Sequence, residues 1–207
     1  MDHTRFVLDN TRPQLVPLVP EVILHGADDV ISLWEATAKD DPPFWAFPWA
    51  GGQALARYVL DHPEVVIGRH VLDLASGSGL VAIAARLAGA AMATANDIDP
   101  LATAAIPLNA ALNGVTITTA NTDLLGGEPN AYDVVLAGDV FYDRGMANRV
   151  LPFLRAATGR GAAVLVGDPQ RAHLPRAEFT VLASYDVPVH SALESEQTKR
   201  TTILRPK

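Results

Sequence analysis

The chain has 207 residues and no cysteine, so disulfide bonds and thiolate chemistry are excluded. No apolar run approaches the roughly 20 residues that a membrane-spanning helix needs, because Gly, Asp or Arg interrupts each run. The N-terminal sequence MDHTRFVLDNTRPQ lacks the basic start and apolar stretch of a secretory signal. Together these absences predict a cytoplasmic protein that does not associate with membranes.

Basic residues are also few. The chain has 16 Lys and Arg against 23 Asp and Glu, which gives a formal net charge of −7. A general nucleic-acid binder neutralises phosphates with clustered basic residues, and no such cluster is visible, so nucleic acid is not an expected partner. The six histidines form no pair at metal-ligand spacing, and no metal site is predicted.

From about residue 69 onward, short apolar or β-branched runs alternate with Ala-rich stretches. This is the pattern of repeated βαβ units, and it predicts an α/β fold with a mainly parallel sheet. The expected strands are His70–Ala75, Ala91–Asp97, Val115–Ala120, Asp133–Asp139, Ala162–Asp168, Phe179–Val187 and Thr198–Leu204. The connection His190–Lys199 is too short for a crossover helix, so we expect the last two strands to be antiparallel.

Punctuating residues mark the helices. Leu80–Ala88 should be helical and end at Gly89, where a left-handed cap is favourable. The next helix should have Asp99 as its N-cap and Pro100 in its first position, and should end at Asn113-Gly114. Before residue 69, three prolines predict an extended Arg12–Leu24, and helices are expected at Ala27–Ala38 and Gly52–Leu60. The length suits one domain spanning residues 1–207.

The segment VLDLASGSG, residues 71–79, is an apolar strand that runs into a glycine-containing turn and then a helix. Such a turn brings backbone close to a ligand at the carboxyl edge of a sheet, which indicates a nucleotide-type ligand. The turn also satisfies a loose dinucleotide pattern. However, Asp73 lies inside the first strand, Asp97 ends the second and Asp123 follows the third. Three carboxylates would repel a pyrophosphate but suit a ligand with an ammonium, a sulfonium and hydroxyls.

VLDLASGSG resembles the first motif of the class I, seven-strand methyltransferases, and NDIDP at residues 96–100 resembles their second. The resemblance implies a Rossmann-like, twisted, mainly parallel seven-stranded sheet with helices on both faces and a C-terminal antiparallel strand pair. It also implies S-adenosylmethionine as cofactor. Ala75 stands where these enzymes usually have their first glycine, which leaves slightly less room near the methionine part of the cofactor.

The same resemblance assigns the three acids. Asp73 would hold the methionine amine directly or through water, Asp97 the ribose hydroxyls and Asp123 the adenine amino group. The alternative for Asp97 and Asp123 is that they are ordinary strand-end or turn acids. The full set of expected cofactor contacts is Trp49, Asp73, Ala75, Ser76, Gly77, Gly79, Asp97, Ile98, Asp123, Leu124 and Ala137.

The fourth predicted strand, in YDVVLAGDVFYD at residues 132–143, ends in Asp139-Val140-Phe141-Tyr142 at the same sheet edge. A carboxylate with aromatic rings can bind an ammonium. The motif resembles the acidic-x-x-aromatic signature of methyltransferases that act mostly on protein lysines. PFWAFPWAGGQALARYVLDHP, residues 43–63, is similar to the electron-transfer-flavoprotein β-subunit lysine methyltransferases and their bacterial relatives. The resemblance covers roughly residues 40–170.

This family resemblance implies a protein substrate, the β subunit of electron-transfer flavoprotein, and the enzyme is expected to be a monomer. Asp139 would orient the amine and receive or relay its proton, and Tyr142 would shape the channel. Residues 1–50 would form an N-terminal extension and a lid or substrate segment, and residues 51–207 the cofactor-binding core. The expected substrate contacts are Trp45, Phe47 and Phe141.

Other interpretations stay open at this point. Phe44 and Phe47 could simply seal the N-terminal segment onto the sheet. Asp41-Pro42-Pro43-Phe44 matches a motif of methyltransferases acting on adenine or glutamine amino groups, but it does not follow the fourth strand. The enzyme could methylate a small molecule or a different protein. A non-catalytic cofactor-binding protein and a dehydrogenase are the remaining alternatives.

Overall fold

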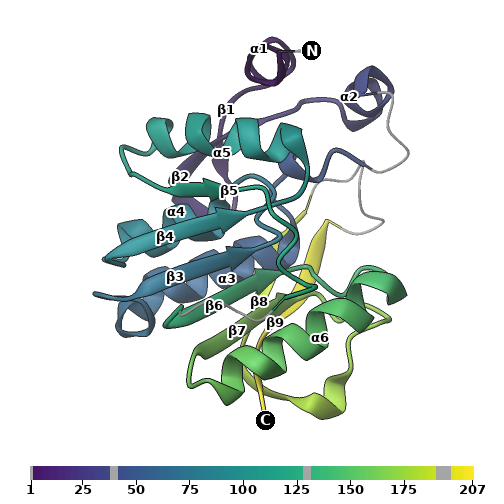
Figure 1. The fold of residues 1–207 in the computed structure, drawn as a ribbon. Helices are drawn as coiled ribbons and strands as arrows, with labels where there is room; N and C mark the ends of the chain where they lie inside the picture. The colour runs from purple at the N-terminus through teal and green to yellow at the C-terminus, as the bar shows by residue number, and fades with distance from the viewer. Residues whose placement is uncertain (1, 38–41, 128–131, 190–196) are drawn as a thin grey trace.

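The computed structural model describes residues 2–37, 42–127, 132–189 and 197–207. Figure 1 shows the order of the elements. The helices are α1 His3–Asn10, α2 Val30–Thr37, α3 Ala50–Asp61, α4 Leu80–Leu87, α5 Pro100–Leu112 and α6 Arg144–Gly159, with short 3-10 turns η1 Phe44–Ala46, η2 Pro63–Val65 and η3 Arg176–Glu178. The strands are β1 Arg12–Val16, β2 Val19–Gly26, β3 His70–Leu74, β4 Met92–Asn96, β5 Thr118–Ala120, β6 Val134–Gly138, β7 Ala163–Asp168, β8 Phe179–Pro188 and β9 Thr198–Pro206.

Within the described residues, seven strands form one sheet in the order β5-β4-β3-β6-β7-β9-β8. The pairs from β5 to β7 are parallel, and β9 runs antiparallel to both β7 and β8. The predicted α/β class, the seven strands and the antiparallel C-terminal pair are therefore confirmed. The strand order reverses between β3 and β6, and open parallel sheets bind ligands outside the carboxyl ends of the strands at such a point.

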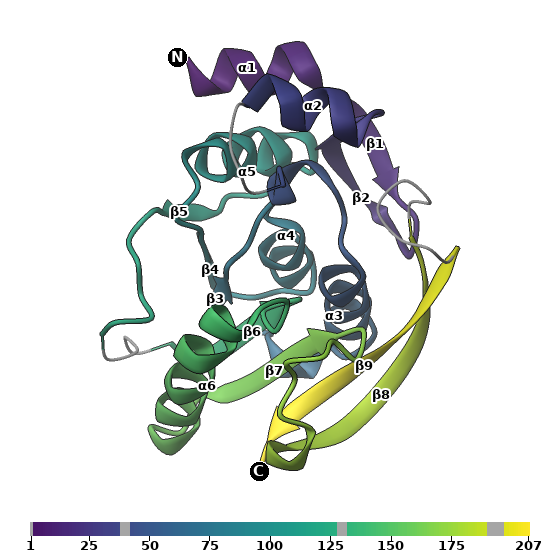
Figure 2. The ribbon, with the colours of Figure 1, turned by 90° about the vertical axis from the view of Figure 1, so that its right-hand side faces the viewer.

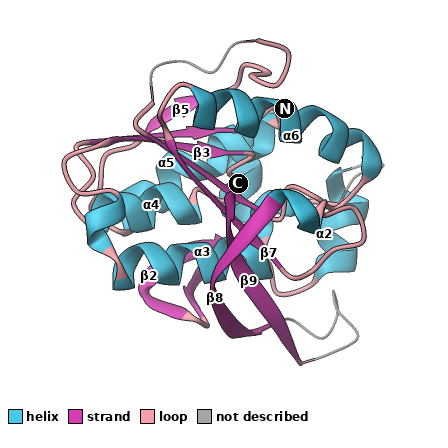
Figure 3. Ribbon diagram, turned by 90° about the horizontal axis from the view of Figure 1, so that it is seen from below, coloured by secondary structure: helices cyan, strands magenta, loops and turns pink. Residues whose placement is uncertain are grey.

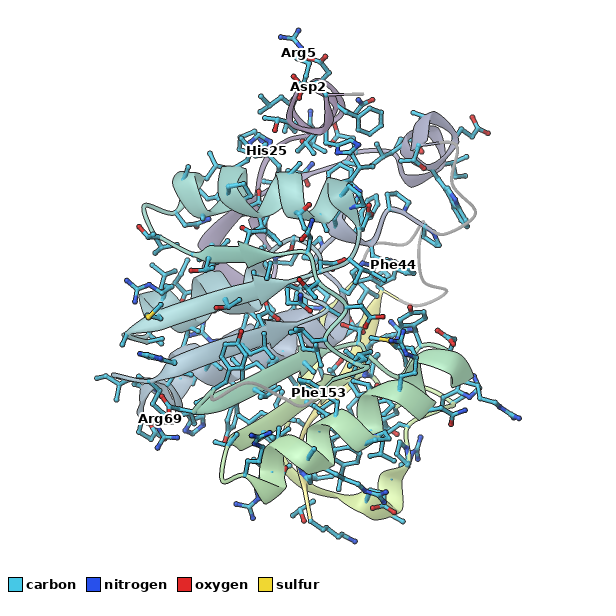
Figure 4. The ribbon with its side chains drawn as sticks, in the orientation of Figure 1. Asp2, Arg5, His25, Phe44, Arg69 and Phe153 are labelled. Atoms are coloured by element: carbon cyan, nitrogen blue, oxygen red, sulfur yellow. The ribbon has the colours of Figure 1, made fainter. Side chains whose placement is uncertain are left out.

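Helices cover both faces of this sheet. Residues of α3 and α4 and Ile106 of α5 pack with Val71, Val134 and Leu136 into one core cluster. On the other face, α6 packs against β3, β6 and β7, and Phe153 is one of its buried side chains. Figure 3 shows the strands as a layer between α6 and the α3–α4 pair, and Figure 4 shows Phe153 between α6 and the sheet. Alternate strand residues thus face two separate apolar layers.

The predicted limits of α5 are confirmed. Asp99 is its N-cap, with its carboxylate accepting a hydrogen bond from Leu101 N, and Pro100 occupies the first turn. Asn113 is the C-cap, and Gly114 follows with a φ of 63°. Helix α4 likewise ends just before Gly89, whose φ is 95°. These are the positions at which cap chemistry alone specifies the backbone.

The N-terminal region differs more from expectation. The predicted extended segment is an antiparallel hairpin of β1 and β2, preceded by α1, which the sequence did not indicate. Buried valines of this hairpin pack with the same cluster as α3 and α4, so the hairpin lies outside the helical layer. Among the described residues, α2 begins at Val30 rather than Ala27, and Ala38 lies outside them.

Two further predictions concern strands of the main sheet. The edge strand β5 is shorter than predicted, because only Thr118–Ala120 pairs with β4. The predicted connection between the last two strands falls largely on residues 190–196, outside the described residues, although β8 and β9 do pair as expected. In the part of the chain that the structure describes, no helix is both long and apolar enough to cross a membrane.

Candidate active site

A cavity of about 820 Å³ opens where β3, β4 and β6 end. It is lined by the turn that follows β3, by the residues that follow β4 and β6, and by the aromatic segment that precedes α3. Figure 2 looks onto this edge of the sheet. In Figure 4, Phe44 lies on this side of the molecule, opposite Arg69, which precedes β3. The cavity therefore occupies the topological switch point of the sheet.

The turn after β3 wraps around the Asp73 carboxylate. Asp73 Oδ2 accepts hydrogen bonds from Ser76 Oγ at 2.5 Å and from Ala82 N, in α4, at 3.0 Å. Ala75, Gly77 and Gly79 all have positive φ values, of 53°, 56° and 85°. The left-handed region is open to glycine but costs other residues free energy, so Ala75 holds a strained backbone.

Asp73 is fully buried, and burial raises the pKa of its carboxyl to about 7. Burial disfavours the charged form unless a positive group comes close. Because Asp73 also lines the cavity, an ammonium bound there would compensate for the lost hydration. This carboxylate is therefore suited to a cationic part of a ligand.

Asp97 follows β4 and is joined to the same turn. Its Oδ2 accepts from Gly77 N at 2.8 Å, and its Oδ1 accepts from Asp99 N at 2.9 Å. Burial raises its pKa, while the two N–H groups oppose the rise. Each carboxylate oxygen has further lone pairs, so Asp97 can accept hydrogen bonds from a pair of ligand hydroxyls.

Asp123 lines the cavity but is in a different environment. Its Oδ2 lies 2.6 Å from Arg149 Nη2, and about half of its side chain is exposed. The hydrogen bond from Arg149 lowers its pKa, and Leu125 N also donates to it. Its expected contact with adenine stays a prediction, because the guanidinium already occupies one carboxylate oxygen.

The aromatic segment closes one side of the cavity. Phe44 stacks at tilted angles against Trp49 and Tyr142, with ring centroids 5.6 and 5.4 Å apart. Trp49 Nε1 donates to Phe44 O at 2.9 Å. Trp45 Nε1 is buried without a hydrogen-bond partner among the described residues. Phe47 is buried and packs with Trp45, so the segment is both a seal and part of the cavity wall.

Asp139 lies at the end of β6, with a φ of 57°. Its Oδ2 accepts from Gly52 N at 2.9 Å and its Oδ1 accepts from Arg171 Nη2 at 2.9 Å. Burial raises the pKa of Asp139, and the Arg171 cation is the largest effect opposing the rise. Asp139, Tyr142 and Arg171 all line the cavity.

Most of the predicted site residues come together here. The predicted residues that line the cavity are Trp45, Phe47, Trp49, Asp73, Ala75, Ser76, Gly77, Asp97, Ile98, Asp123, Leu124, Asp139 and Tyr142. The fourth residue of the adenine- or amide-specific motif, Phe44, also lines it, whereas Asp41 lies outside the described residues.

Three predicted contacts need correction, because these residues do not line the cavity. Phe141 is fully buried in the core beneath α6, where its ring meets that of Phe179 edge-on at 5.7 Å. Ala137 faces the same core cluster, since alternate residues of β6 point to opposite faces. Gly79 is the left-handed N-cap of α4 and shapes the turn instead.

The sequence reasoning missed Arg171 and the glycine contact that supports Asp139. A Cβ on Gly51 would lie 2.2 Å from Gly167 O and 2.6 Å from Asp139 Oδ2, so only glycine lets α3 approach β7 this closely. Gly138 meets the backbone of Gly52 in the same way. One feature could have pointed to Arg171. Because β6 and β7 are neighbours in the sheet, a charged residue just after β7 lies near the acid that follows β6.

The strand order and the acid-lined cavity define the class as that of the class I, S-adenosylmethionine-dependent methyltransferases. The sequence model of the family described as ribosomal protein L11 methyltransferase (PrmA) matches residues 53–140. Among solved structures, a putative RNA methyltransferase from Pyrococcus horikoshii superposes with a TM-score of 0.58 at 18% identity, covering 85% of this chain and 97% of that one. The magnesium protoporphyrin IX methyltransferase from Synechocystis PCC 6803, with bound S-adenosylmethionine, has a TM-score of 0.55 at 14% identity, covering 75% of this chain and 78% of that one.

The chain belongs to the electron transfer flavoprotein beta subunit lysine methyltransferase family. It is 41% identical over 197 residues to the family member of Danio rerio. The alignment covers 90% of this chain and 76% of that protein. The protein is accordingly an S-adenosylmethionine-dependent methyltransferase, and the resemblance stated from the sequence motifs is confirmed.

The residues present fit this cofactor. Asp73 offers a buried, otherwise poorly compensated carboxylate for the methionine ammonium, and Asp97 offers two oxygens for the ribose hydroxyls. The glycine-containing turn provides room for close backbone approach. When bound, S-adenosylmethionine supplies an activated methyl group on a sulfonium.

Proposed function

We propose that this protein is a protein-lysine N-methyltransferase that acts on the β subunit of electron-transfer flavoprotein. The observation that carries the proposal is the arrangement at the end of β6. A largely buried carboxylate, Asp139, lines one cavity together with the Phe44 and Tyr142 rings and with the cofactor acids Asp73 and Asp97. A lysine side chain needs these groups: an anion for its charged end and aromatic faces along its path.

The chemistry sets a clear requirement. A lysine amine with an ordinary pKa near 10.4 is almost fully protonated at neutral pH, and its deprotonation costs roughly 4–5 kcal/mol. In our proposal Asp139 binds the ammonium, orients its nitrogen along the line of methyl transfer and accepts or relays the proton. Burial supports this role, because a raised pKa makes the Asp139 carboxylate a better proton acceptor than an exposed one.

The aromatic segment has a second part in the proposal. Phe44, Trp45 and Trp49 would exclude water from the reacting amine, which favours its uncharged form. Residues 1–50 would act as an N-terminal extension that includes this lid or substrate segment, attached to a cofactor-binding core of residues 51–207. We further propose that the protein is cytoplasmic, in keeping with its lack of cysteine, and that it works as a monomer.

Transfer of radiolabelled methyl groups tests the proposal. Purified protein is incubated with labelled S-adenosylmethionine and either purified electron-transfer flavoprotein or a cell extract. We expect label on lysines of the β subunit, and none with Asp139→Asn although that variant still binds cofactor. Label on small molecules alone would contradict the proposal in favour of a small-molecule N-methyltransferase. Label on another protein alone would leave the enzyme class intact but overturn the substrate.

A further inference from the structure

Asp139 shares its carboxylate between two elements. Oδ2 accepts the hydrogen bond from Gly52 N in the first turn of α3, and Oδ1 accepts the one from Arg171 Nη2 in the loop after β7, each at 2.9 Å. The exposed fractions of the Arg171 and Asp139 side chains are 22% and 13%. This largely buried pair is screened less than a surface ion pair.

The loop after β7 is built to bring Arg171 to this position. Gln170 adopts a φ of 63°, and the next residue, Arg171, lines the cavity. Arg171 N then donates to Asp168 Oδ1 at 2.8 Å, so the backbone is tied to the strand end. Holding a non-glycine residue in the left-handed region costs free energy, and such strain persists where the surrounding structure requires the geometry.

The surroundings of Asp139 contain few other charges. The first turn of α3 carries no acidic side chain, and Gly51 and Gly52 present only backbone to the carboxylate. Asp168, at the end of β7, accepts from Arg171 N, and the charge of Asp139 contributes to raising its pKa, so the two carboxylates repel each other. Its Oδ2 lacks a hydrogen-bond partner among the described residues. Asp73, from β3, lines the same cavity. Of the charged groups in this neighbourhood, Arg171 is therefore the one that favours an ionised Asp139.

We infer that Arg171 is a positioning residue for methyl transfer, which holds the Asp139 carboxylate ionised and fixed in the orientation that receives the substrate amine. The inference rests on the proposed function, because it assigns Asp139 to the amine. Arg171 does not need to touch the substrate for this role. Its cation offsets the cost of burying the carboxylate, and its hydrogen bond leaves Asp139 one preferred orientation.

Arg171→Met removes the charge and the hydrogen bond. Arg171→Lys keeps the charge, and Arg171→Gln keeps only a neutral donor. Without the cation the pKa of Asp139 should rise further, so the acidic limb of the pH profile of kcat/KM should move to higher pH by about one unit or more. We expect Arg171→Met to lose about tenfold or more of its activity at neutral pH and to regain much of it at high pH. Arg171→Lys should stay close to the wild-type limb.

Arg155→Met is the control, because Arg155 lies in α6, is exposed and pairs with Glu178 rather than with Asp139. It should leave the profile unchanged. If Arg171→Met does not fold, Arg171→Gln carries the same measurement. A loss of activity by the same factor at every pH, with no movement of the limb, would reduce Arg171 to a structural role and overturn the inference.

A second measurement separates this inference from the proposed function. The carboxyl carbon of Asp139, labelled with carbon-13 and assigned by comparison with Asp139→Asn, is titrated by NMR in the wild type and in the Arg171 variants. We expect a higher Asp139 pKa in Arg171→Met, whether or not the flavoprotein is methylated. An unchanged titration overturns the inference, whereas absence of methylation by the wild type overturns the proposed function.

Discussion

Asn109 donates its side-chain amide to Ser78 O at 2.7 Å and so ties α5 directly to the turn that shapes the cofactor site. The oxygen of the same amide accepts from His25 N, in β2, at 2.7 Å. Asn109 is fully buried. One side chain thus joins the N-terminal hairpin, α5 and the cofactor turn.

Replacing Asn109 with Ala should therefore destabilise the protein and weaken the cofactor site together. Two buried backbone groups would lose their partners, which costs about 1–3 kcal/mol each. We expect the free energy of unfolding, measured by urea denaturation, to fall by about 2–4 kcal/mol, and the Kd for S-adenosylmethionine to rise. Asn10→Ala, at an exposed position in α1, is the control and should change neither. Equal effects of the two substitutions would contradict this role for Asn109.

Two adjacent glycines in α3 should respond differently to the same substitution. Gly51→Ala places a methyl group 2.2 Å from Gly167 O, so the helix must move away from β7 and Asp139. We expect Gly51→Ala to lose several kcal/mol of stability and most of its methyltransferase activity. At Gly52 the nearest atom to an added Cβ is a Leu80 side-chain carbon at 3.9 Å, and Gly52→Ala should fold with unchanged or slightly higher stability. Thermal unfolding of both variants is the measurement, and a Gly51→Ala protein as stable as Gly52→Ala would refute the close approach.

The strained turn at Ala75 offers a stabilising substitution. Ala75 has a φ of 53°, in the left-handed region that favours glycine. Ala75→Gly should relieve about 0.5–1.5 kcal/mol of strain, partly offset by the greater flexibility of glycine in the unfolded chain. Ala82→Gly, inside α4, should instead destabilise by about 1 kcal/mol. If both substitutions lowered the stability by a similar amount, Ala75 would not be strained.

The stability of the cofactor-free protein should fall as the pH rises. Asp73 titrates near 3.8 when exposed but at about 7 in the fold. Between these values the folded state keeps a proton that the unfolded state releases, so folding is favoured at low pH and this contribution is lost on rising through pH 7. Asp168, with a pKa raised to about 6, acts in the same direction.

Thermal melts at pH 5 and pH 8 measure this dependence. The melting temperature of Asp73→Asn should drop less between pH 5 and pH 8 than that of the wild type. The difference between the two drops should correspond to a free energy of unfolding on the order of 2–4 kcal/mol. S-adenosylmethionine should restore the melting temperature of the wild type at pH 8 but not that of the variant. Identical pH dependence of the two proteins would show that Asp73 is not a buried, easily protonated acid.

The features that could be predicted from the sequence were those that depend on residues close together in the chain. Asp99, Pro100 and Gly114 act on the backbone next to them, and the limits of α5 were predictable from them. The acids after successive parallel strands were predictable as a group, because such strand ends meet at one edge. Phe141 was misplaced, because its position two residues after Asp139 does not show whether its ring points into the cavity or into the core beneath α6.

Other features needed information that no local pattern contains. Arg171 reaches Asp139 across 32 positions of sequence, through a turn at Gln170 that no glycine marks. The contact between Gly51 and Gly167 depends on how closely α3 lies against β7. Both contacts depend on distances of a few ångströms between elements that are far apart in the sequence. A sequence motif can indicate such a contact only when the order of the strands in the sheet is known.

The central claim is that Asp73 and Asp97 hold S-adenosylmethionine at the edge of the sheet, and calorimetric titration of the cofactor tests it most directly. Wild-type protein at pH 8 should bind with measurable heat. Asp73→Asn and Asp97→Asn should each bind at least about tenfold more weakly, since a buried charged or hydrogen-bonded partner is lost. Exposed Asp61→Asn, in α3 and remote from the cavity, should bind as the wild type does. Equal affinity of the wild type and both site variants, or no binding by the wild type, would contradict the account.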